Sequence, residues 1–342
     1  MKSVTIVGGG LAGLTLGIGL RQKNVPVTVL EAGNFPRHRV CGEFISGKGL
    51  ESMTRLGLRQ CLEAAGAVEG TTAAFFSETK STGPRRLPAR ALCLSRFDMD
   101  AQLAGQFQGL GGELRTGFRF SEEFQESIVR ATGRRPQTDN HGTRWFGLKV
   151  HAKNVPLTAD LELHFSRSGY VGLCRLAGGV VNICGLFRKP AYEHVSLPWR
   201  QILNGRPGSI LHQRLAAADF DNETFCAVAG LSLQPQIASD HPECCVGDAI
   251  TMIPPMTGNG MSMAFESAEL AIEPLALWSC GDLSWVESRS EVASRCDIAF
   301  ARRLRWASWL QRLMLLPALQ NNLVAVACRS DWLSRLAFER TR

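Results

Sequence analysis

Residues 3–13, SVTIVGGGLAG, decide the fold. Their first five residues form an apolar, β-branched run typical of a buried strand, and residues 11–23 have the apolar spacing of a helix. Residues 26–30 predict a second strand. The stretch therefore opens a β-α-β unit, with a glycine-rich turn between its first strand and its helix.

The glycines of this turn match G-x-G-x-x-G, the pattern that binds a dinucleotide. Gly8 permits the tight turn, Gly10 lets the backbone approach a pyrophosphate, and Gly13 lets helix and strand pack closely. The helix begins at Leu11 and Ala12, where unpaired N–H groups favour an anion. A dinucleotide is expected here.

Glu31 ends the second strand, eighteen residues beyond Gly13. In this position a carboxylate accepts hydrogen bonds from ribose hydroxyls and repels the 2′-phosphate of NADP. It does not separate NAD from FAD.

A second motif, VGDAITMIPPMTGNGM at residues 246–261, leads into an apolar helix. It resembles the G-D…P…G-x-G signature of the flavoprotein hydroxylases, which implies that the dinucleotide is FAD. The resemblance implies that Asp248 binds the ribityl chain and that Pro255 shapes the loop. It also implies that backbone N–H groups at the start of the helix face the N1/O2 edge of the flavin. The cofactor contacts it implies are Gly247, Asp248, Pro255, Gly258, Asn259, Gly260 and Met261.

Two further segments resemble the same superfamily. Residues 36–46, PRHRVCGEFIS, are similar to the P-x-x-R-x-x-C-G-E segment of its geranylgeranyl-reductase-like branch, which implies that Arg39 contacts FAD and that Cys41 and Gly42 lie near the ring. Residues 94–98, LSRFD, resemble the helix opening whose arginine, here Arg96, reaches the phosphate and ribityl region.

The implied fold is α/β, that of para-hydroxybenzoate hydroxylase: a Rossmann-like FAD domain with an interleaved antiparallel substrate sheet and C-terminal helices. Strands are expected at residues 145–151, 159–166, 170–175 and 179–187, and helices at 96–109, 260–278 and most of 284–342, with a break at Pro317. We assign residues 1–72, 91–140 and 236–300 to the FAD domain, 73–90 and 141–235 to the substrate domain, and 301–342 to a C-terminal helical segment.

The chain departs from the family at two motifs. The A-D-G segment associated with the reductant reads Ala131-Thr132-Gly133, so direct use of NADH or NADPH is left open. The Trp-x-Trp-x-Ile-Pro motif of flavin halogenases is absent, because the corresponding strand reads YVGLCR at residues 170–175.

The resemblance implies an FAD-dependent monooxygenase that hydroxylates or epoxidises a small lipophilic or aromatic substrate, polyketide- or isoprenoid-like, through a C4a-hydroperoxyflavin. One alternative is a double-bond reductase of the geranylgeranyl-reductase type. Another, of a different class, is a cyclase or binding protein in which FAD is structural. No dedicated acid or base is required; His151, His164, Lys149 and Tyr170 are weak candidates on the substrate strands.

Composition fits a globular protein, with 342 residues, 45% hydrophobic and 20% charged. Eleven scattered cysteines without a CxxC pair indicate neither a metal site nor a disulfide framework. No export signal precedes the first strand and no apolar run reaches the roughly 20 residues that span a bilayer, so a cytoplasmic protein is expected. No nucleic-acid-binding module is recognisable.

The positive charge lies at the C-terminus. Residues 301–342 hold eight Arg against one Asp and one Glu, a charge of +6 out of the total of +7. Trp306, Trp309, Leu310 and Leu313 fall on one helical face. That face either packs against the FAD domain or rests on a membrane surface.

Overall fold

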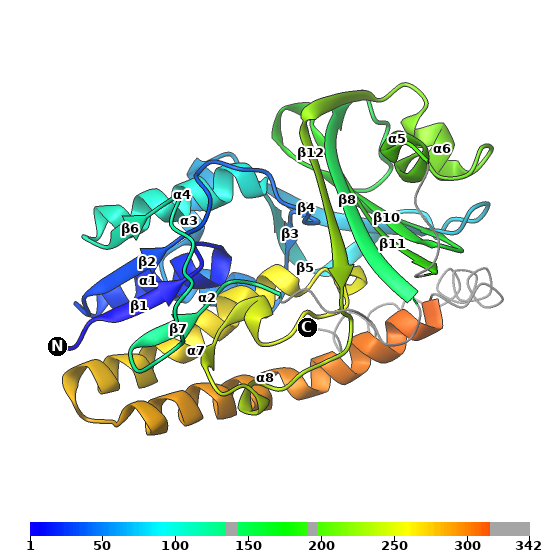
Figure 1. Cartoon of the computed structure of the whole chain (residues 1–342). Helices are drawn as coiled ribbons and strands as arrows, with labels where there is room; N and C mark the ends of the chain where they lie inside the picture. The colour runs from blue at the N-terminus through cyan, green and yellow to red at the C-terminus, as the bar shows by residue number, and fades with distance from the viewer. Residues whose placement is uncertain (135–142, 191–196, 315–342) are drawn as a thin grey trace.

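The computed structural model describes residues 1–134, 143–190 and 197–314, and contains two sheets (Figure 1). One is a parallel sheet with helices packed on it, and the other is a curved, mainly antiparallel sheet. The expected α/β class is confirmed. No helix of the described residues is long and apolar enough to cross a membrane.

The five-stranded sheet A has the order β13-β7-β1-β2-β6, with all its neighbours parallel. Its strands are β1 (Val4–Val7), β2 (Val27–Leu30), β6 (Glu113–Arg115), β7 (Ile128–Arg130) and β13 (Cys244–Cys245). Helix α1 (Leu11–Gln22) contacts both α4 (Arg96–Gly109) and α7 (Gly260–Cys280), and α7 contacts α2 (Lys48–Arg55) and α8 (Trp285–Met314). Ten consecutive residues of α1, Leu11 to Leu20, are buried, which explains why the helix is apolar on all sides.

The eight-stranded sheet B has the order β12-β8-β11-β10-β9-β4-β5-β3. Its strands are β3 (Phe44–Ile45), β4 (Val68–Phe76), β5 (Arg85–Cys93), β8 (Thr143–Lys153), β9 (Leu161–Ser166), β10 (Gly169–Arg175), β11 (Val181–Pro190) and β12 (Asp219–Leu231). Only β4 and β9 pair in parallel. Strands β3, β4 and β5 precede α4 in the sequence, and the other five strands of sheet B follow it.

One face of sheet B is covered by α5 (Trp199–Leu203) and α6 (Ile210–Leu215), which pack on Leu148, Val150 and Ile183. The other face looks toward sheet A across a cavity. Because side chains alternate along a strand, neighbouring residues of β8, β9 and β10 belong to opposite faces. This alternation decides which of them can reach a ligand.

The remaining elements are short. They are α3 (Arg59–Ala64) and the 3₁₀ turns η1 (Ala177–Gly179), η2 (Ala238–Asp240), η3 (Gly247–Ala249) and η4 (Pro255–Thr257). The last two turns build the loop that carries the second sequence motif.

Several boundaries differ from the sequence prediction; β9, for example, begins at Leu161 instead of 159. Strand β11 begins at Val181 instead of 179, because Gly178 and Gly179 have φ of 66° and 72°, outside the strand region. Strand β4 begins at Val68, ahead of the predicted domain boundary at 73. Helix α8 is continuous from Trp285 to Met314, so no element begins at 301. The predicted helix beyond Met314, including the break at Pro317, lies outside the described residues.

Candidate functional site

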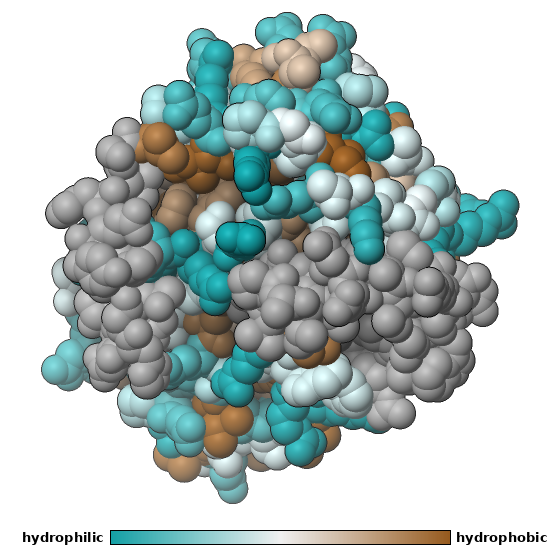
Figure 2. Space-filling view, turned by 90° about the vertical axis from the view of Figure 1, so that its right-hand side faces the viewer, coloured by the Kyte–Doolittle hydropathy of each residue, from teal (hydrophilic) through white to brown (hydrophobic). Residues whose placement is uncertain are grey.

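A cavity of about 1590 Å³ lies between the carboxyl ends of the strands of sheet A and the uncovered face of sheet B. Gly8 and Gly10 line it at one end, and Phe165 and Leu186 of sheet B line it at the other. Apolar side chains gather in the hollow seen on the side of the molecule shown in Figure 2. The volume exceeds the 300–1,000 Å³ usual for one small ligand, so it has room for a dinucleotide and a second molecule.

The glycine turn has the geometry that its sequence requires. Gly8 has φ of 113°, and a Cβ there would lie 2.3 Å from the carbonyl oxygen of Ala131. A Cβ on Gly13 would lie 1.9 Å from the carbonyl oxygen of Gly8. At Gly10 a Cβ would meet nothing within 4 Å, because this residue faces the cavity. Leu11 and Ala12 also line the cavity, and α1 begins there with no side-chain cap.

Glu31 lies beside this turn with both carboxylate oxygens engaged. It accepts hydrogen bonds of 2.8 Å from the Gly9 and Gly33 N–H groups, and pairs with Arg37 at 2.7 Å. Burial would raise the pKa of Glu31, but the bonds from Arg37 and Gly33 outweigh it and lower the pKa. Glu31 is therefore ionised, and a ribose hydroxyl would share it with Arg37, a residue that the sequence patterns did not single out.

Three arginines line the cavity near the turn, and each has a different environment. Arg96 is held by Asp100 through two bonds of 2.8 and 2.9 Å. Arg39 forms no hydrogen bond or ion pair within the described part of the chain, so its charge is available to an anion. Arg134, which sequence reasoning missed, follows the glycine of Ala131-Thr132-Gly133.

The second motif touches the first. A Cβ on Gly247, whose φ is 63°, would lie 2.7 Å from the Cβ of Ala12. The Gly247 N–H donates to the Ser267 hydroxyl at 2.8 Å, which ties the loop to α7. Asp248 lines the cavity. Burial raises the pKa of Asp248, while the charges of Arg134 and Arg96 act against this effect.

The rest of this loop leads the backbone to the start of α7. Pro255 opens the turn η4, and Gly258 has φ of 67°. Asn259 is buried at the N-cap position of α7. Of the cofactor contacts predicted in this motif, Asp248, Pro255, Gly258, Gly260 and Met261 line the cavity, whereas Gly247 and Asn259 do not. Helix α7 thus begins at the cavity with no acidic residue in its first turn.

In the segment from Arg39 to Glu43, Cys41 and Gly42 line the cavity. The Asn182 side-chain amide donates to the Cys41 carbonyl at 2.9 Å. Glu43 has φ of 56° and is fully buried. Its carboxylate accepts from the Arg96 N–H at 2.9 Å, at the start of α4.

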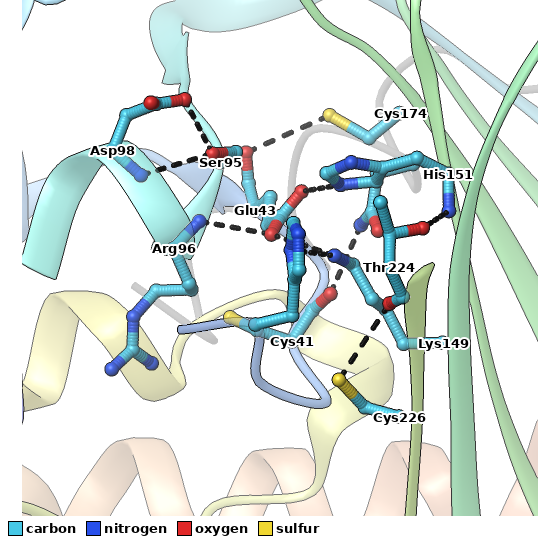
Figure 3. Close-up of polar contacts among 12 residues, drawn as sticks. Cys41, Glu43, Ser95, Arg96, Asp98, Lys149, His151, Cys174, Thr224 and Cys226 are labelled. Carbon is cyan, nitrogen blue, oxygen red and sulfur yellow. Dashed lines mark hydrogen bonds and ion pairs between the residues drawn. The ribbon is translucent and has the colours of Figure 1, made fainter. Parts of the chain in front are cut away.

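Two residues of β8 hold the Glu43 carboxylate from the other side (Figure 3). His151 donates through Nε2 at 2.7 Å, and the Lys149 ammonium lies 3.5 Å away. Burial would raise the pKa of Glu43, but His151 and Lys149 outweigh it and lower the pKa. His151 and Lys149 are thus occupied in fastening residues 41–43 to sheet B.

His38 completes this cluster. Its Nδ1 lies 3.1 Å from the Lys149 Nζ, and because an ammonium only donates, Nδ1 must accept and the ring proton must lie on Nε2. Burial and the Lys149 charge lower the pKa of His38 to about 4, so the ring is neutral near pH 7. His38 also lines the cavity, which gives the site a neutral N–H donor that sequence reasoning missed.

His164 lies on the opposite face of sheet B. It is buried, stacks on Phe76 at 4.3 Å, and donates to Glu162 at 3.0 Å; Arg214 of α6 binds the same Glu162 at 3.1 Å. The expectation that His164 could reach a substrate is therefore wrong for this cavity, because adjacent side chains of β9 point to opposite faces of sheet B.

Tyr170 is the one residue of the four weak catalytic candidates that lines the cavity. Burial raises the pKa of Tyr170 well above its usual value, so the hydroxyl stays protonated. Its ring packs in a cluster with Phe165, Leu186, Leu231 and Met256. This end of the cavity is thus mainly apolar, with a phenol as a polar group.

These residues fit FAD. The open space at Gly10, the unpaired Arg39 and the start of α1 suit a pyrophosphate, and the contact between Ala12 and Gly247 joins the two motifs into one site. Asp248 and the start of α7 stand where a ribityl chain and an isoalloxazine edge would continue from it.

Comparisons with known proteins agree with this fit. Residues 1–144 match a family model described as an FAD binding domain. A 77-residue stretch is 32% identical to a squalene epoxidase of Aspergillus fumigatus. This stretch covers 22% of this chain and only 16% of that relative's length.

Solved structures share the fold over nearly the whole chain. A flavin-dependent brominase, Bmp2, has a TM-score of 0.72 at 18% identity, covering 96% of this chain and 94% of its own. The halogenase PltM has a TM-score of 0.72 at 16% identity, covering 91% and 76%. PqsL, described as a probable FAD-dependent monooxygenase from Pseudomonas aeruginosa, has a TM-score of 0.68 at 15% identity, covering 92% and 97%.

The two motifs and the family match give one result: FAD is the cofactor of this chain.

Proposed function

We propose that the protein is an FAD-dependent monooxygenase that inserts one oxygen atom into a small apolar or aromatic substrate, by hydroxylation or epoxidation. When bound, FAD supplies the reaction with O₂ and the oxygen transfer. The chain's own residues bind the cofactor, exclude water and position the acceptor carbon.

The observation that carries this proposal is the apolar half of the cavity. Beyond the expected flavin position, the wall includes the apolar residues Phe75, Leu163, Phe165, Leu186, Met252 and Met256. A dry apolar pocket is suited to oxygen transfer, because water would destroy a reactive oxygenated intermediate before it reached the substrate. It also binds an apolar acceptor through the hydrophobic effect.

Two residues provide polar contacts at this pocket. The Tyr170 hydroxyl stays protonated, and the neutral His38 ring carries its proton on Nε2. Both can donate a hydrogen bond to a substrate oxygen without introducing a charge. Neither is placed to act as a strong base, which agrees with a reaction whose chemistry resides in the cofactor.

Halogenation, which the names of Bmp2 and PltM suggest, is less well supported. Their likeness to this chain is below 20% identity and shows the fold alone. Strand β10 reads YVGLCR where flavin halogenases carry Trp-x-Trp-x-Ile-Pro. The squalene epoxidase match, although short, favours oxygenation of an apolar molecule.

A single-turnover experiment tests the proposal. The holoprotein is photoreduced without oxygen, mixed with a panel of apolar probes (squalene, farnesol, a simple phenol and pyrrole), and then divided into an aerobic and an anaerobic portion. A monooxygenase forms product only in the aerobic portion. Product in the anaerobic portion would instead establish a double-bond reductase of the geranylgeranyl-reductase type, with hydride passing to carbon.

The same panel with protein reconstituted with a non-reducible FAD analogue tests the remaining alternative. Turnover retained with the analogue would establish a structural role for FAD and overturn the proposal. Anaerobic titration with NADH and with NADPH then identifies the reductant, which the missing aspartate at Thr132 leaves open.

A further inference from the structure

The C-terminal half of α8 has three faces with different surroundings. On the first, Leu304 and Ala307 are buried in the main core. Arg303 forms a buried ion pair with Glu266 of α7 through two bonds of 2.7 and 2.5 Å. This face fixes the helix firmly against the FAD domain.

The second face of α8 is a wall of the cavity. Trp306, Leu310 and Leu313 line it, and Leu310 packs against the cluster that contains Tyr170 and Met256. In Figure 1 the helix runs beneath the FAD domain and ends below sheet B. Helix α8 therefore borders the apolar, substrate end of the cavity.

The third face looks outward. Ile298, Arg302, Arg305, Trp309 and Arg312 follow one another in steps of four, three, four and three residues, which places them on one side of a helix. All five are exposed, with Ile298 80% and Trp309 55% accessible. We call these five residues the outward stripe.

The outward stripe is basic, and none of the described residues forms an ion pair with it. No acidic residue occurs between 298 and 314 in the sequence. Arg302, Arg305 and Arg312 form no ion pair with any residue that the structure describes. Three unpaired guanidinium groups beside an exposed tryptophan and isoleucine are the side-chain set that binds an interface of anionic headgroups over an apolar layer.

From this arrangement we infer that the outward stripe docks the protein on the surface of an anionic lipid bilayer. The arginines bind lipid phosphates, while Trp309 and Ile298 enter the boundary between headgroups and acyl chains. A nucleic acid would match the charge equally well but would leave the exposed Ile298 without a favourable environment.

The cavity adds a second reason for a bilayer. Trp309 belongs to the outward stripe and also lines the cavity, and its ring meets that of Trp306 at 5.6 Å. A lipid-dissolved molecule at the stripe would therefore stand at the cavity wall. This route of entry rests on the proposed function, whereas the docking itself does not.

Vesicle co-sedimentation of the full-length holoprotein tests the docking. The probes are phosphatidylcholine vesicles with and without phosphatidylglycerol. We expect binding to the anionic vesicles, and a loss on the order of a hundredfold in affinity for the triple variant Arg302→Gln, Arg305→Gln, Arg312→Gln, since each surface arginine contributes roughly fivefold. Trp309→Ala should weaken binding by about tenfold.

A matched control removes the same charge elsewhere. Arg90→Gln, Arg115→Gln and Arg206→Gln neutralise exposed arginines outside α8, and this triple variant should bind anionic vesicles within about twofold of wild type. The flavin absorbance and circular dichroism of every variant establish that it is folded, so a loss of vesicle binding is not caused by unfolding.

Three results would overturn the inference: equal binding to neutral vesicles, equal loss in the control triple variant, or full binding by the stripe variants. A dimer in analytical ultracentrifugation that dissociates on Trp309→Ala would also overturn it, since the stripe would then be an interface between two copies. None of these measurements depends on turnover, so they stand apart from the test of the monooxygenase.

Discussion

Gly10 and Gly13 lie within one turn of chain, yet their surroundings are opposite. The missing side chain of Gly13 leaves room for the Gly8 carbonyl, which is a packing requirement of the protein alone. The missing side chain of Gly10 leaves room in the cavity, which is a requirement of a ligand. Gly13 is therefore required for folding, and Gly10 for cofactor binding.

Gly13→Ala should destabilise the fold itself, by about 2 kcal/mol or more, because a methyl group 1.9 Å from a carbonyl oxygen forces the helix away from the strand. Gly10→Ala should leave the melting temperature of the FAD-free protein unchanged and weaken FAD binding by about tenfold or more. Fluorescence titration with FAD and thermal unfolding of the apoprotein give both numbers. Equal effects of the two substitutions would contradict this assignment.

Lys149 and Glu43 form a fully buried pair, and removal of one partner should cost more than removal of the charge on both. Lys149→Met should lower the free energy of unfolding by about 3 to 5 kcal/mol. Adding Glu43→Gln to this variant should restore part of the loss, because glutamine still accepts from the Arg96 N–H and carries no charge. Urea unfolding of the two variants provides the check; a double variant that is less stable than Lys149→Met would refute the pairing.

Residue roles that depend on a turn or a motif were accessible from the sequence, and roles that depend on long-range contact were not. Glycine conformations at Gly8, Gly13 and Gly258 follow from local backbone geometry. The local pattern of residues 36–46 includes Glu43, but the contacts of Glu43 and His38 with His151 and Lys149 join residues more than a hundred positions apart, so the sequence does not indicate this cluster. Tyr170 and His164 occupy neighbouring strands, and only register places Tyr170 on the cavity and His164 on the opposite face of the sheet.

At the scale of elements, β9 shows how one strand serves two purposes. Leu161, Leu163 and Phe165 line the cavity, while Glu162 and His164 face α6. The Glu162 carboxylate accepts from the Thr158 N–H at 2.6 Å and from Arg214, and so ties the helix layer to the sheet.

This tie should make stability depend on pH. Burial would raise the pKa of Glu162, but hydrogen bonds from His164 and Thr158 outweigh it and lower the pKa from 4.5 to about 2. The stabilisation is fully present above pH 4.5 and is lost as the pH falls toward 2, an amount on the order of 3 kcal/mol.

Unfolding free energies of wild type and Glu162→Gln, measured from neutral pH down to about pH 3, test this dependence. The gap between the two proteins should narrow as the pH falls below 4.5, since the carboxyl becomes neutral in the unfolded wild type first. Parallel curves across this range would show that Glu162 is not held as a carboxylate.

Elements with strong periodicity were predicted well. The helices at α1, α4 and α7 and the strands at β8, β9 and β10 overlap the predicted ranges, with ends that differ by at most two residues, because each carries its own apolar pattern. The start of β11 was wrong by two residues, since Gly178 and Gly179 end a turn that apolar spacing does not reveal. The pairing of β4 with β9 in parallel joins segments separated by α4, and no sequence pattern indicates it.

At the scale of the whole molecule, the site exists only because two sheets and α8 meet around one cavity. The end of the cavity that binds the dinucleotide could be predicted from its two sequence motifs. The apolar end could not, because its wall takes side chains from β4, β9, β10, β11 and α8, whose relative register the sequence leaves undefined.

Filling the apolar end should therefore block turnover and leave the cofactor bound. Val228 of β12 lines the cavity, so Val228→Trp should lower product formation by about tenfold or more while the FAD content stays within about twofold of wild type. Ala229→Trp, on an exposed neighbouring residue outside the cavity wall, is the matched control and should retain activity. Loss of FAD in the Val228 variant would place the flavin, instead of the substrate, at this end.

The most direct test of the monooxygenase is the origin of the oxygen atom in the product. The photoreduced holoprotein is mixed with the apolar probe panel under ¹⁸O₂ in ordinary water, and the product is analysed by mass spectrometry. The account predicts a product that carries one labelled oxygen atom. An unlabelled product, or one whose oxygen comes from water, would contradict it.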